Sequence, residues 1–281
     1  MDIAEILKKA EKGRLGYCKQ CPWSPEYEQS VAFGDSCIAC GINWEKEKKA
    51  NSMFIVQDPG DTTPRDTRTL CAVHNAKNPS DKTAQQALHL WNAAVSLKHN
   101  KPEAGGYLKK HYWTNAIMHG ASRKTGLREK SIMKAARKSC SNVLALQIMA
   151  LKPNVIVAKG TEAVNSLYEI DIIKRNWSLM RHYFKSGAYS EDVTSWRGLP
   201  QFKVFCTYHT SAKVVNQTLS KLYDSVKTEA YIKEKVQKLN TPDSINQFLS
   251  TYEEPDKDKR SRGMRFLLNH WIDIGLAIRG S

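Results

Sequence analysis

No apolar run in this chain approaches the roughly 18 residues that a membrane-spanning helix needs, although 41% of its 281 residues are hydrophobic. The first ten residues have the pattern of an amphipathic helix and lack the features of a signal peptide. Internal repeats are also absent. These absences argue against a membrane, secreted or repeat protein, and they predict a cytoplasmic globular protein that is expected to be a monomer.

Acidic residues are scarce relative to basic ones. The chain has 28 Asp and Glu against 43 Lys and Arg, which gives a formal net charge of +15. Such a surplus predicts a polyanionic partner, and nucleic acid is favoured. A membrane surface is the weaker alternative, because no predicted helix combines a strong apolar face with a basic one.

The cysteine count does not suit a disulfide framework, since seven is an odd number and the chain has the character of a cytosolic protein. Four cysteines form two C-x-x-C pairs, Cys18 with Cys21 and Cys37 with Cys40, separated by fifteen residues. This spacing is typical of a tetrahedral four-cysteine zinc site. Such a site would be structural, because four thiolates leave no open coordination position. Unligated thiols are the alternative.

The chain is organised around the stretch from Met53 to Asp61. Four apolar residues, Met53 to Val56, predict a short buried strand, and Pro59 with Gly60 ends it abruptly. Gln57 and Asp58 then lie at the carboxyl edge of the strand, where open parallel sheets bind their ligands. Asp58 is therefore either a catalytic carboxylate or a residue that caps the following turn.

Alternating strand and helix patterns predict an α/β fold. We expect a three-layer α/β/α sandwich with a central four-stranded, mainly parallel sheet. The predicted strands are 53–57, 111–117, 154–158 and 202–208, and the predicted helices are 2–12, 84–98, 129–151, 161–169 and most of the chain after 212. The expected segments are 1–50 (a helix and the cysteine pairs), 51–215 (the α/β domain) and 216–281 (a helical extension packed on it).

Each predicted strand ends in a polar group, namely Asp58, Asn115, Lys159 and His209. In a parallel sheet these ends meet at one edge, so the four side chains are expected to share a cleft. An amide such as Asn115 offers both a donor and an acceptor to a base edge. His209 can donate to an oxygen that gains charge as a bond breaks, and Asp58 can hold a water or face a developing cation.

These segments resemble the uracil-DNA glycosylase superfamily in their order. The matching stretches are Gln57-Asp58-Pro59, Tyr112 to Asn115, Cys140 to Gly160, His209-Thr210-Ser211, and the opening from Cys18 to Gly34. The likeness spans roughly residues 15–215 and is greatest to the iron–sulfur branch of the superfamily. No similar likeness covers residues 216–281.

The resemblance implies a monofunctional DNA glycosylase that flips a base out of the duplex and hydrolyses its N-glycosidic bond. It assigns catalysis to Asp58 and His209. The residues that it places around the base are Gln57, Gly60, His74 and Asn115. The residues expected to contact DNA are Arg65, Arg68, His119, Arg123, Lys124, Lys159, Ser211, Lys213 and Val214, of which Val214 belongs to an apolar wedge.

Two departures from the family bear on the substrate. Gly60 stands where one branch places a tyrosine that blocks the C5 position of the pyrimidine, and no Phe, Tyr or Trp occurs between Ile55 and Leu90 to stack on a base. His74 is the nearest substitute. An open C5 side suits a bulkier base than uracil, such as hydroxymethylcytosine or its glucoside in phage DNA, and hence a role in phage defence. A non-catalytic nucleic-acid-binding protein on the same fold is the alternative.

A third departure concerns the metal. In the iron–sulfur branch the ligands correspond to Cys18, Cys21, a cysteine after the asparagine strand, and Cys140. His119 occupies the third of these places here. We therefore expect structural Zn²⁺ on the four cysteines of the C-x-x-C pairs, with a [4Fe–4S] cluster on Cys18, Cys21, Cys140 and a fourth ligand as the alternative.

Overall fold

The computed structural model describes residues 1–23, 30–33, 49–57, 82–96, 111–121, 129–180, 187–211, 213–239 and 242–280. A five-stranded sheet lies at its centre, with the strand order β3-β2-β5-β7-β6. The strands are β2 (Ser52–Val56), β3 (His111–Asn115), β5 (Val155–Lys159), β6 (Tyr189–Val193) and β7 (Phe202–Thr207). A small antiparallel pair, β1 (Ser30–Phe33) with β4 (His119–Ala121), stands apart from this sheet.

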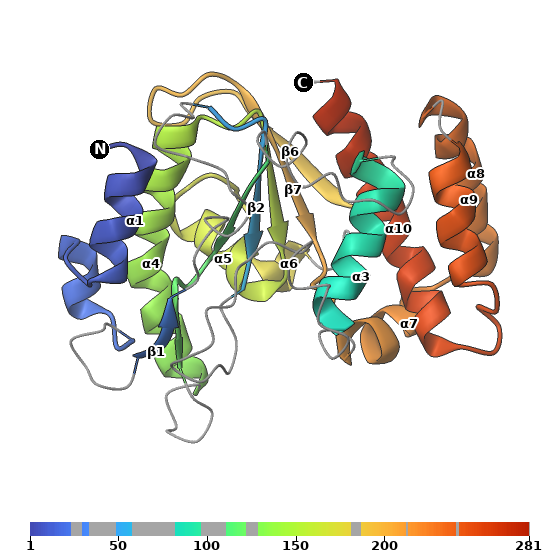
Figure 1. Ribbon diagram of the computed structural model, residues 1–281, viewed down its shortest axis with the longest axis horizontal. Helices are drawn as coiled ribbons and strands as arrows, with labels where there is room; N and C mark the ends of the chain where they lie inside the picture. The colour runs from blue at the N-terminus through green and yellow to red at the C-terminus, as the bar shows by residue number, and fades with distance from the viewer. Residues whose placement is uncertain are drawn as a thin grey trace.

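Helices cover both faces of the sheet, as Figure 1 shows. One layer contains α1 (Ile3–Glu11), α4 (Lys130–Leu151) and α5 (Thr161–Glu169), with the short α6 (Trp177–Met180) beside α5. The other contains α3 (Lys82–Trp91) and α10 (Lys259–Arg279), with α8 (Ser225–Leu239) and α9 (Pro242–Thr251) outside α10. The predicted α/β/α sandwich is confirmed.

Shorter helical segments complete the chain. They are η1 (Gly16–Gln20), the π-helical turns η3 (Asn92–Ser96) and η7 (Val214–Leu219), and α7 (Ser220–Leu222). Within the described ranges, the predicted helices and the four predicted strands agree with the structure to within a few residues at their ends. No helix among the described residues is long and apolar enough to cross a bilayer.

The sheet has one strand more than predicted. Residues 189–193 fall between the predicted helix 161–169 and the predicted strand 202–208, where no element was predicted, and they form β6, which pairs antiparallel with β7 at the sheet edge. The sequence of β6 is Tyr-Ser-Glu-Asp-Val, and its side chains are mostly half-buried or exposed. Ser, Glu and Asp have low strand propensity, so this strand depends on its pairing with β7.

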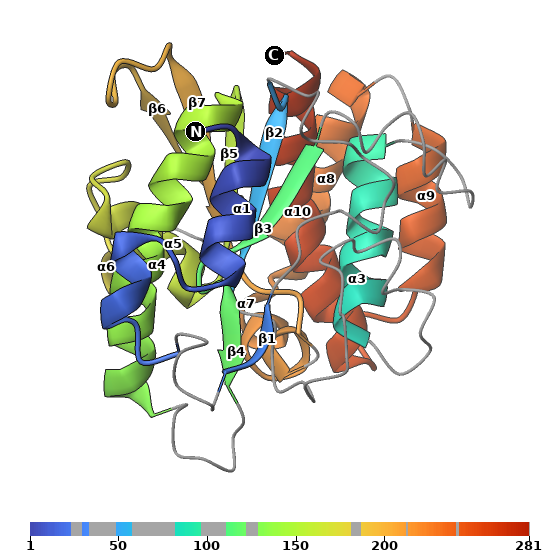
Figure 2. The same cartoon turned by 60° about the vertical axis from the view of Figure 1, so that its left-hand side comes forward.

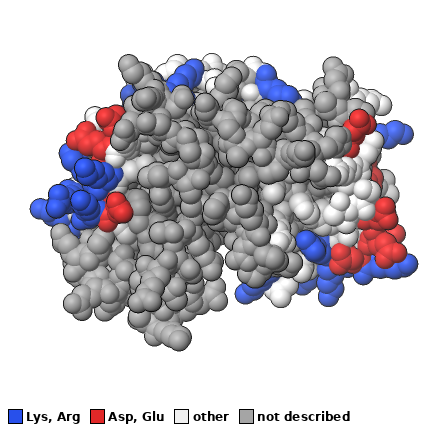
Figure 3. Space-filling model, in the orientation of Figure 1, with Lys and Arg blue, Asp and Glu red and all other residues white. Residues whose placement is uncertain are grey.

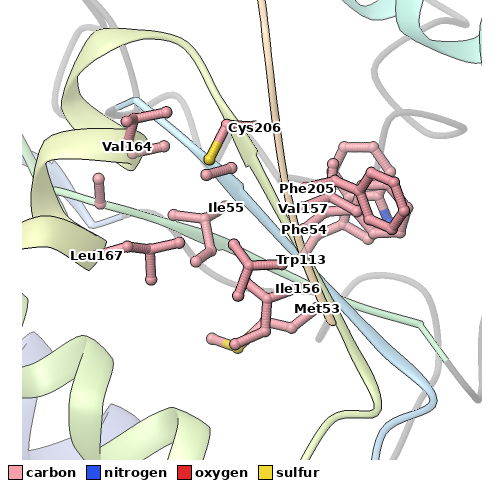
Figure 4. Close-up of a cluster of buried hydrophobic side chains, with 14 of the residues drawn as sticks. Met53, Phe54, Ile55, Trp113, Ile156, Val157, Val164, Leu167, Phe205 and Cys206 are labelled. Atoms are coloured by element: carbon pink, nitrogen blue, oxygen red, sulfur yellow. The ribbon is translucent and has the colours of Figure 1, made fainter. Parts of the chain in front are cut away.

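The two faces of the sheet are packed differently. On the α4 side, Gln147 Oε1 accepts hydrogen bonds from the hydroxyls of Tyr112 and Thr114, each at 2.9 Å. On the α10 side, the Phe54 ring stacks on Trp113, with centroids 4.5 Å apart, and on Trp271 of α10 at 5.8 Å. Figure 4 shows Ile55, Ile156 and Cys206 directed to the opposite side from Phe54, Val157 and Phe205. Successive residues of each strand therefore serve opposite faces.

Two glycines allow α10 to approach its neighbours closely. A Cβ on Gly275 would lie 1.9 Å from the carbonyl oxygen of Ala94 in η3, and one on Gly263 would lie 2.2 Å from that of Val215 in η7. The N-terminus of α10 is capped by Asp258, which accepts from the backbone N–H groups of Arg260 and Ser261. Residues on both sides of the expected boundary at 215 belong to one hydrophobic core, so α10 forms an integral layer.

Gly275→Ala tests this close approach. The added methyl meets a backbone carbonyl that cannot rotate away, so we expect a loss of about 2–3 kcal/mol in the free energy of unfolding, as for overpacked cores. Urea denaturation measures it. Gly280→Ala is the matched control, because its Cβ would lie 3.6 Å from the nearest atom. A gain in stability from Gly275→Ala, as helix propensity alone predicts, would contradict the packing described.

Candidate functional site

The carboxyl ends of four parallel strands lie side by side along one edge of the sheet. Val56 pairs with Asn115, and Lys159 pairs with Thr207, which precedes His209 by two residues. The predicted gathering of Asn115, Lys159 and His209 at one edge is therefore present. Gln57 follows β2 at the same edge and is half-buried, and its carbonyl oxygen accepts from the N–H of Ile117 at 3.0 Å.

Several predicted site residues lie outside the described residues. They are Cys37, Cys40, Asp58, Gly60, Arg65, Arg68, His74, Arg123 and Lys124. Their assignments stay predictions from the sequence. On the described parts of the face in Figure 3, basic side chains alternate with acidic ones and do not form a single patch.

Asn115 is fully buried at the end of β3. Neither its Nδ2 nor its Oδ1 has a hydrogen-bond partner among the described residues. A buried polar group that is left unpaired costs about 1–3 kcal/mol, and few such groups occur in folded proteins. An amide with both functions unpaired at a ligand-binding edge is suited to pair with a planar group that offers one donor and one acceptor.

His209 is held as a neutral hydrogen-bond donor. Burial, together with the positive charge of Lys159, lowers its pKa to about 4, so the ring is uncharged at neutral pH. The backbone N–H of Ser211 donates to its Nδ1 at 3.2 Å. Since Nδ1 accepts, the proton of the neutral ring resides on Nε2, which can donate.

Gly160 fixes the position of this histidine. Its φ of +88° is one that residues with a side chain rarely adopt, and a Cβ there would lie 3.1 Å from Cβ of His209. The turn from β5 into α5 therefore runs directly against His209. A larger residue at 160 would push the imidazole away from the sheet edge.

Lys159 differs from the expectation that it contacts phosphate, because only 1% of its surface is exposed. Its Nζ lies 5.3 Å from the Trp113 ring and 5.2 Å from the Trp271 ring, and it donates to Thr210 Oγ1 at 3.5 Å. Burial lowers the pKa of Lys159 to about 7. The burial of Lys159 was not predicted from the sequence. The pattern that could have indicated it is a lysine at the end of an otherwise apolar strand, Val-Ile-Val-Ala-Lys.

The residues after His209 begin the turn η7. Ser211 is half-buried, and its Oγ accepts from the N–H of Val214 at 3.5 Å. Lys213 is exposed, whereas Val214 is half-buried. The exposure of Lys213 is compatible with the predicted phosphate contact, and the partial burial of Val214 limits how far it can extend as a wedge without movement of this turn.

The burial of His119 does not suit the predicted contact with DNA, because only 4% of its surface is exposed. It lines a small cavity together with Cys18, Cys21 and Cys140. Its Nε2 donates to the carbonyl oxygen of Glu11 at 3.4 Å, and burial lowers its pKa to about 4. The imidazole is therefore neutral, with its lone pair on Nδ1.

The three thiols at this cavity interact. A hydrogen bond with Cys140 lowers the pKa of Cys21, and the same contact together with burial raises the pKa of Cys140. Three soft sulfur donors and an imidazole suit zinc or an iron–sulfur cluster in kind. As placed, no three His, Cys, Asp or Glu side chains within the described ranges lie close enough together to hold a metal ion.

Comparison with known families gives one match. The family model described as the uracil DNA glycosylase superfamily matches residues 44–240, more than half of the chain. The match covers the whole central sheet and ends before α10. A search of the curated proteins finds no match to this sequence.

The low pKa of Lys159 predicts how stability depends on pH. Between its folded pKa of about 7 and its ordinary value of 10.5, the unfolded chain binds a proton that the folded protein does not. The penalty for burying Lys159 is thus full at and below about pH 7 and disappears as pH rises to about 10.5, a change of at most about 5 kcal/mol. Lys159→Met should therefore raise stability at pH 7 and raise it less near pH 10.

Urea denaturation of the wild type and Lys159→Met over this pH range measures the difference. Lys174→Met is the control, because Lys174 is exposed in a turn beyond α5. A stability difference for Lys159→Met that does not change with pH would contradict the low pKa.

Proposed function

Since this chain belongs to the uracil DNA glycosylase superfamily, we propose that it is a monofunctional DNA glycosylase that excises a C5-modified pyrimidine. The observation that carries the proposal is Asn115, whose amide is fully buried with neither polar atom paired among the described residues. A flipped pyrimidine offers the donor and acceptor that this amide lacks.

The proposed reaction breaks the bond between C1′ of the sugar and the ring nitrogen of the base. The base leaves with the bonding electrons, and Nε2–H of His209 donates to the oxygen on which negative charge collects. Water then adds to C1′ and gives up a proton to Asp58, which also faces the cationic sugar. The products are a free base and an abasic site. The low pKa of His209 supports this role. At neutral pH the ring is uncharged and carries its proton on Nε2, and it would become an imidazolium only below about pH 4.

The proposed substrate rests on Gly60 and on the absence of Phe, Tyr and Trp between Ile55 and Leu90. A glycine has no side chain that would block a substituent at C5 of the base. Without an aromatic residue to stack on the base, binding depends less on the flat face of an unsubstituted ring. Hydroxymethylcytosine and its glucoside, as found in phage DNA, fit such a site. Excision of these bases would serve in defence against phage. A nucleic-acid-binding protein without turnover is the alternative.

One screen tests the proposal. Protein is incubated with DNAs that carry uracil, hydroxymethylcytosine or its glucoside, and abasic sites are counted after alkaline cleavage. We expect abasic sites from a C5-modified base, with rates about a hundredfold to a thousandfold lower in Asn115→Ala and His209→Ala, because each removes one preorganised polar contact. Lys174→Met serves as a surface control. Cleavage of uracil DNA alone would exclude the proposed substrate, and cleavage of none would favour the non-catalytic alternative.

We propose further that Cys18, Cys21, Cys140 and His119 hold a structural metal. Their shared cavity supports this set, and the four side chains would have to move towards one another to bind the metal. The zinc site predicted on Cys18, Cys21, Cys37 and Cys40 stays a prediction, because Cys37 and Cys40 lie outside the described residues. With four protein donors the metal supplies no open coordination position, so its contribution is to join η1, β4 and α4.

Metal analysis of the purified protein distinguishes the two ligand sets. We expect Cys140→Ser to lose bound metal, because it removes one of the four proposed ligands, and Cys37→Ser to keep it. Visible absorbance identifies an iron–sulfur cluster, whereas zinc is colourless. Loss of metal from Cys37→Ser with retention in Cys140→Ser would contradict this proposal and favour the zinc site predicted on Cys18, Cys21, Cys37 and Cys40.

A further inference from the structure

Lys159 is a buried cation without a matching anion. Its Nζ contacts one hydroxyl, Thr210 Oγ1, and the faces of Trp113 and Trp271, and no carboxylate among the described residues pairs with it. A buried ammonium that is not paired is costly, and the two indole rings offset only part of this cost. Such an arrangement is suited to an anion that is present only during part of a reaction.

The ammonium lies at the proposed site. Lys159 is the last residue of β5, and Gly160 next to it runs against His209. Thr210, which receives the Nζ hydrogen bond, follows His209 directly and in turn donates to the carbonyl oxygen of Thr83 in α3 at 3.4 Å. Thr210 thus connects the Lys159 ammonium to α3, and the charge of Lys159 acts on the neighbouring His209.

We propose that Lys159 supplies a buried positive charge that stabilises, through His209 and Thr210, the negative charge that collects on the departing base. This inference rests on the proposed glycosylase function and specifies the leaving group as a heterocycle that departs as an anion. Lys159 does not touch the base, so it is a positioning residue. Because the space between the sheet and α10 excludes water, a charge there acts over a longer range than at the surface.

Other charged groups around Lys159 do not duplicate this role. Two titratable groups of the described elements near it are His209, whose pKa its charge lowers, and His270, which precedes Trp271 on α10. His270 shares a hydrogen bond with Thr207 Oγ1 at 2.9 Å, and burial lowers its pKa to about 3. Both imidazoles are neutral near pH 7. Among the described residues, Lys159 is therefore the source of positive charge at this edge that burial protects from solvent screening.

The wild-type pH profile is the first test, and it needs no variant. Single-turnover rates are measured with excess protein from about pH 6 to pH 9, on whichever DNA of the screen is cleaved. Protonated Lys159 is the active form, so the rate should be constant below its pKa of about 7 and fall above it towards the lower rate of the neutral form, by about tenfold to a hundredfold in total. A rate that stays constant or rises to pH 9 would overturn the inference.

Variants then assign this fall in rate to Lys159. We expect Lys159→Gln to react about tenfold to a hundredfold more slowly near pH 6 and to show no fall between pH 7 and pH 9. Lys159→Arg keeps its charge at all these pH values, so the fall should disappear while more of the rate at pH 6 is retained. The control Lys174→Met should keep the wild-type profile. A wild-type profile in Lys159→Gln would overturn the inference.

Two further measurements separate the possible failures. NMR titration of the His209 ring should show a higher pKa in Lys159→Gln than in the wild type, and an unchanged pKa would overturn the coupling between them. Borohydride should trap no protein–DNA adduct, because Lys159 is proposed to form no bond to the sugar. An adduct that forms in the wild type and is lost in Lys159→Gln would instead identify this lysine as a nucleophile. Cleavage of no DNA by the wild type would overturn the proposed function itself, whereas cleavage with a flat profile would overturn only the role of Lys159.

Discussion

The stacking of Phe54 between the sheet and α10 is the contact on which the rest of the molecule depends. Its ring lies 4.5 Å from Trp113 and 5.8 Å from Trp271, and Trp91 of α3 meets its edge at 5.3 Å. Large aromatic side chains contribute heavily to the energy of a core, and replacing one by alanine costs about 3–5 kcal/mol. One residue of β2 thus joins the sheet to both α3 and α10, and the two tryptophan rings that stack on it, Trp113 and Trp271, also lie beside the Lys159 ammonium.

The same packing determines the chemistry of the site. At the edge where β3, β5 and β7 end, Asn115 and Lys159 are buried and His209 is half-buried, so the charge states of Lys159 and His209 depend strongly on burial. His209 is neutral for this reason, and Lys159 has a pKa near neutrality. An unpaired amide, a neutral donor and a buried cation therefore lie at one edge, and the proposed glycosylase reaction rests on this combination.

Much of this arrangement could be predicted from the sequence, because it follows from short apolar runs. The runs that became β2, β3, β5 and β7 are bounded by Gly, Pro and polar residues, and they placed Asn115 and His209 correctly at one edge. β6 was missed because its polar residues form a strand only by pairing with β7. Burial of Lys159 was missed because it depends on Trp271, which is more than a hundred residues away in the chain. The family resemblance gave Cys18, Cys21 and Cys140 with His119 only as the alternative ligand set, because their grouping depends on α4 and β4 meeting η1.

The position of α10 has a consequence for synthesis of the protein. This helix closes one face of a core whose other parts were all made earlier, and Gly263 and Gly275 let it seat against η7 and η3 with no room to spare. Until residues 259–279 leave the ribosome, Phe54 lacks its stacking partner Trp271 and has only Trp91 and Trp113 beside it. Transiently exposed apolar surface of this kind is prone to aggregate. The nascent chain therefore exposes this surface until α10 has been made, although Asn115 and His209 are translated well before it.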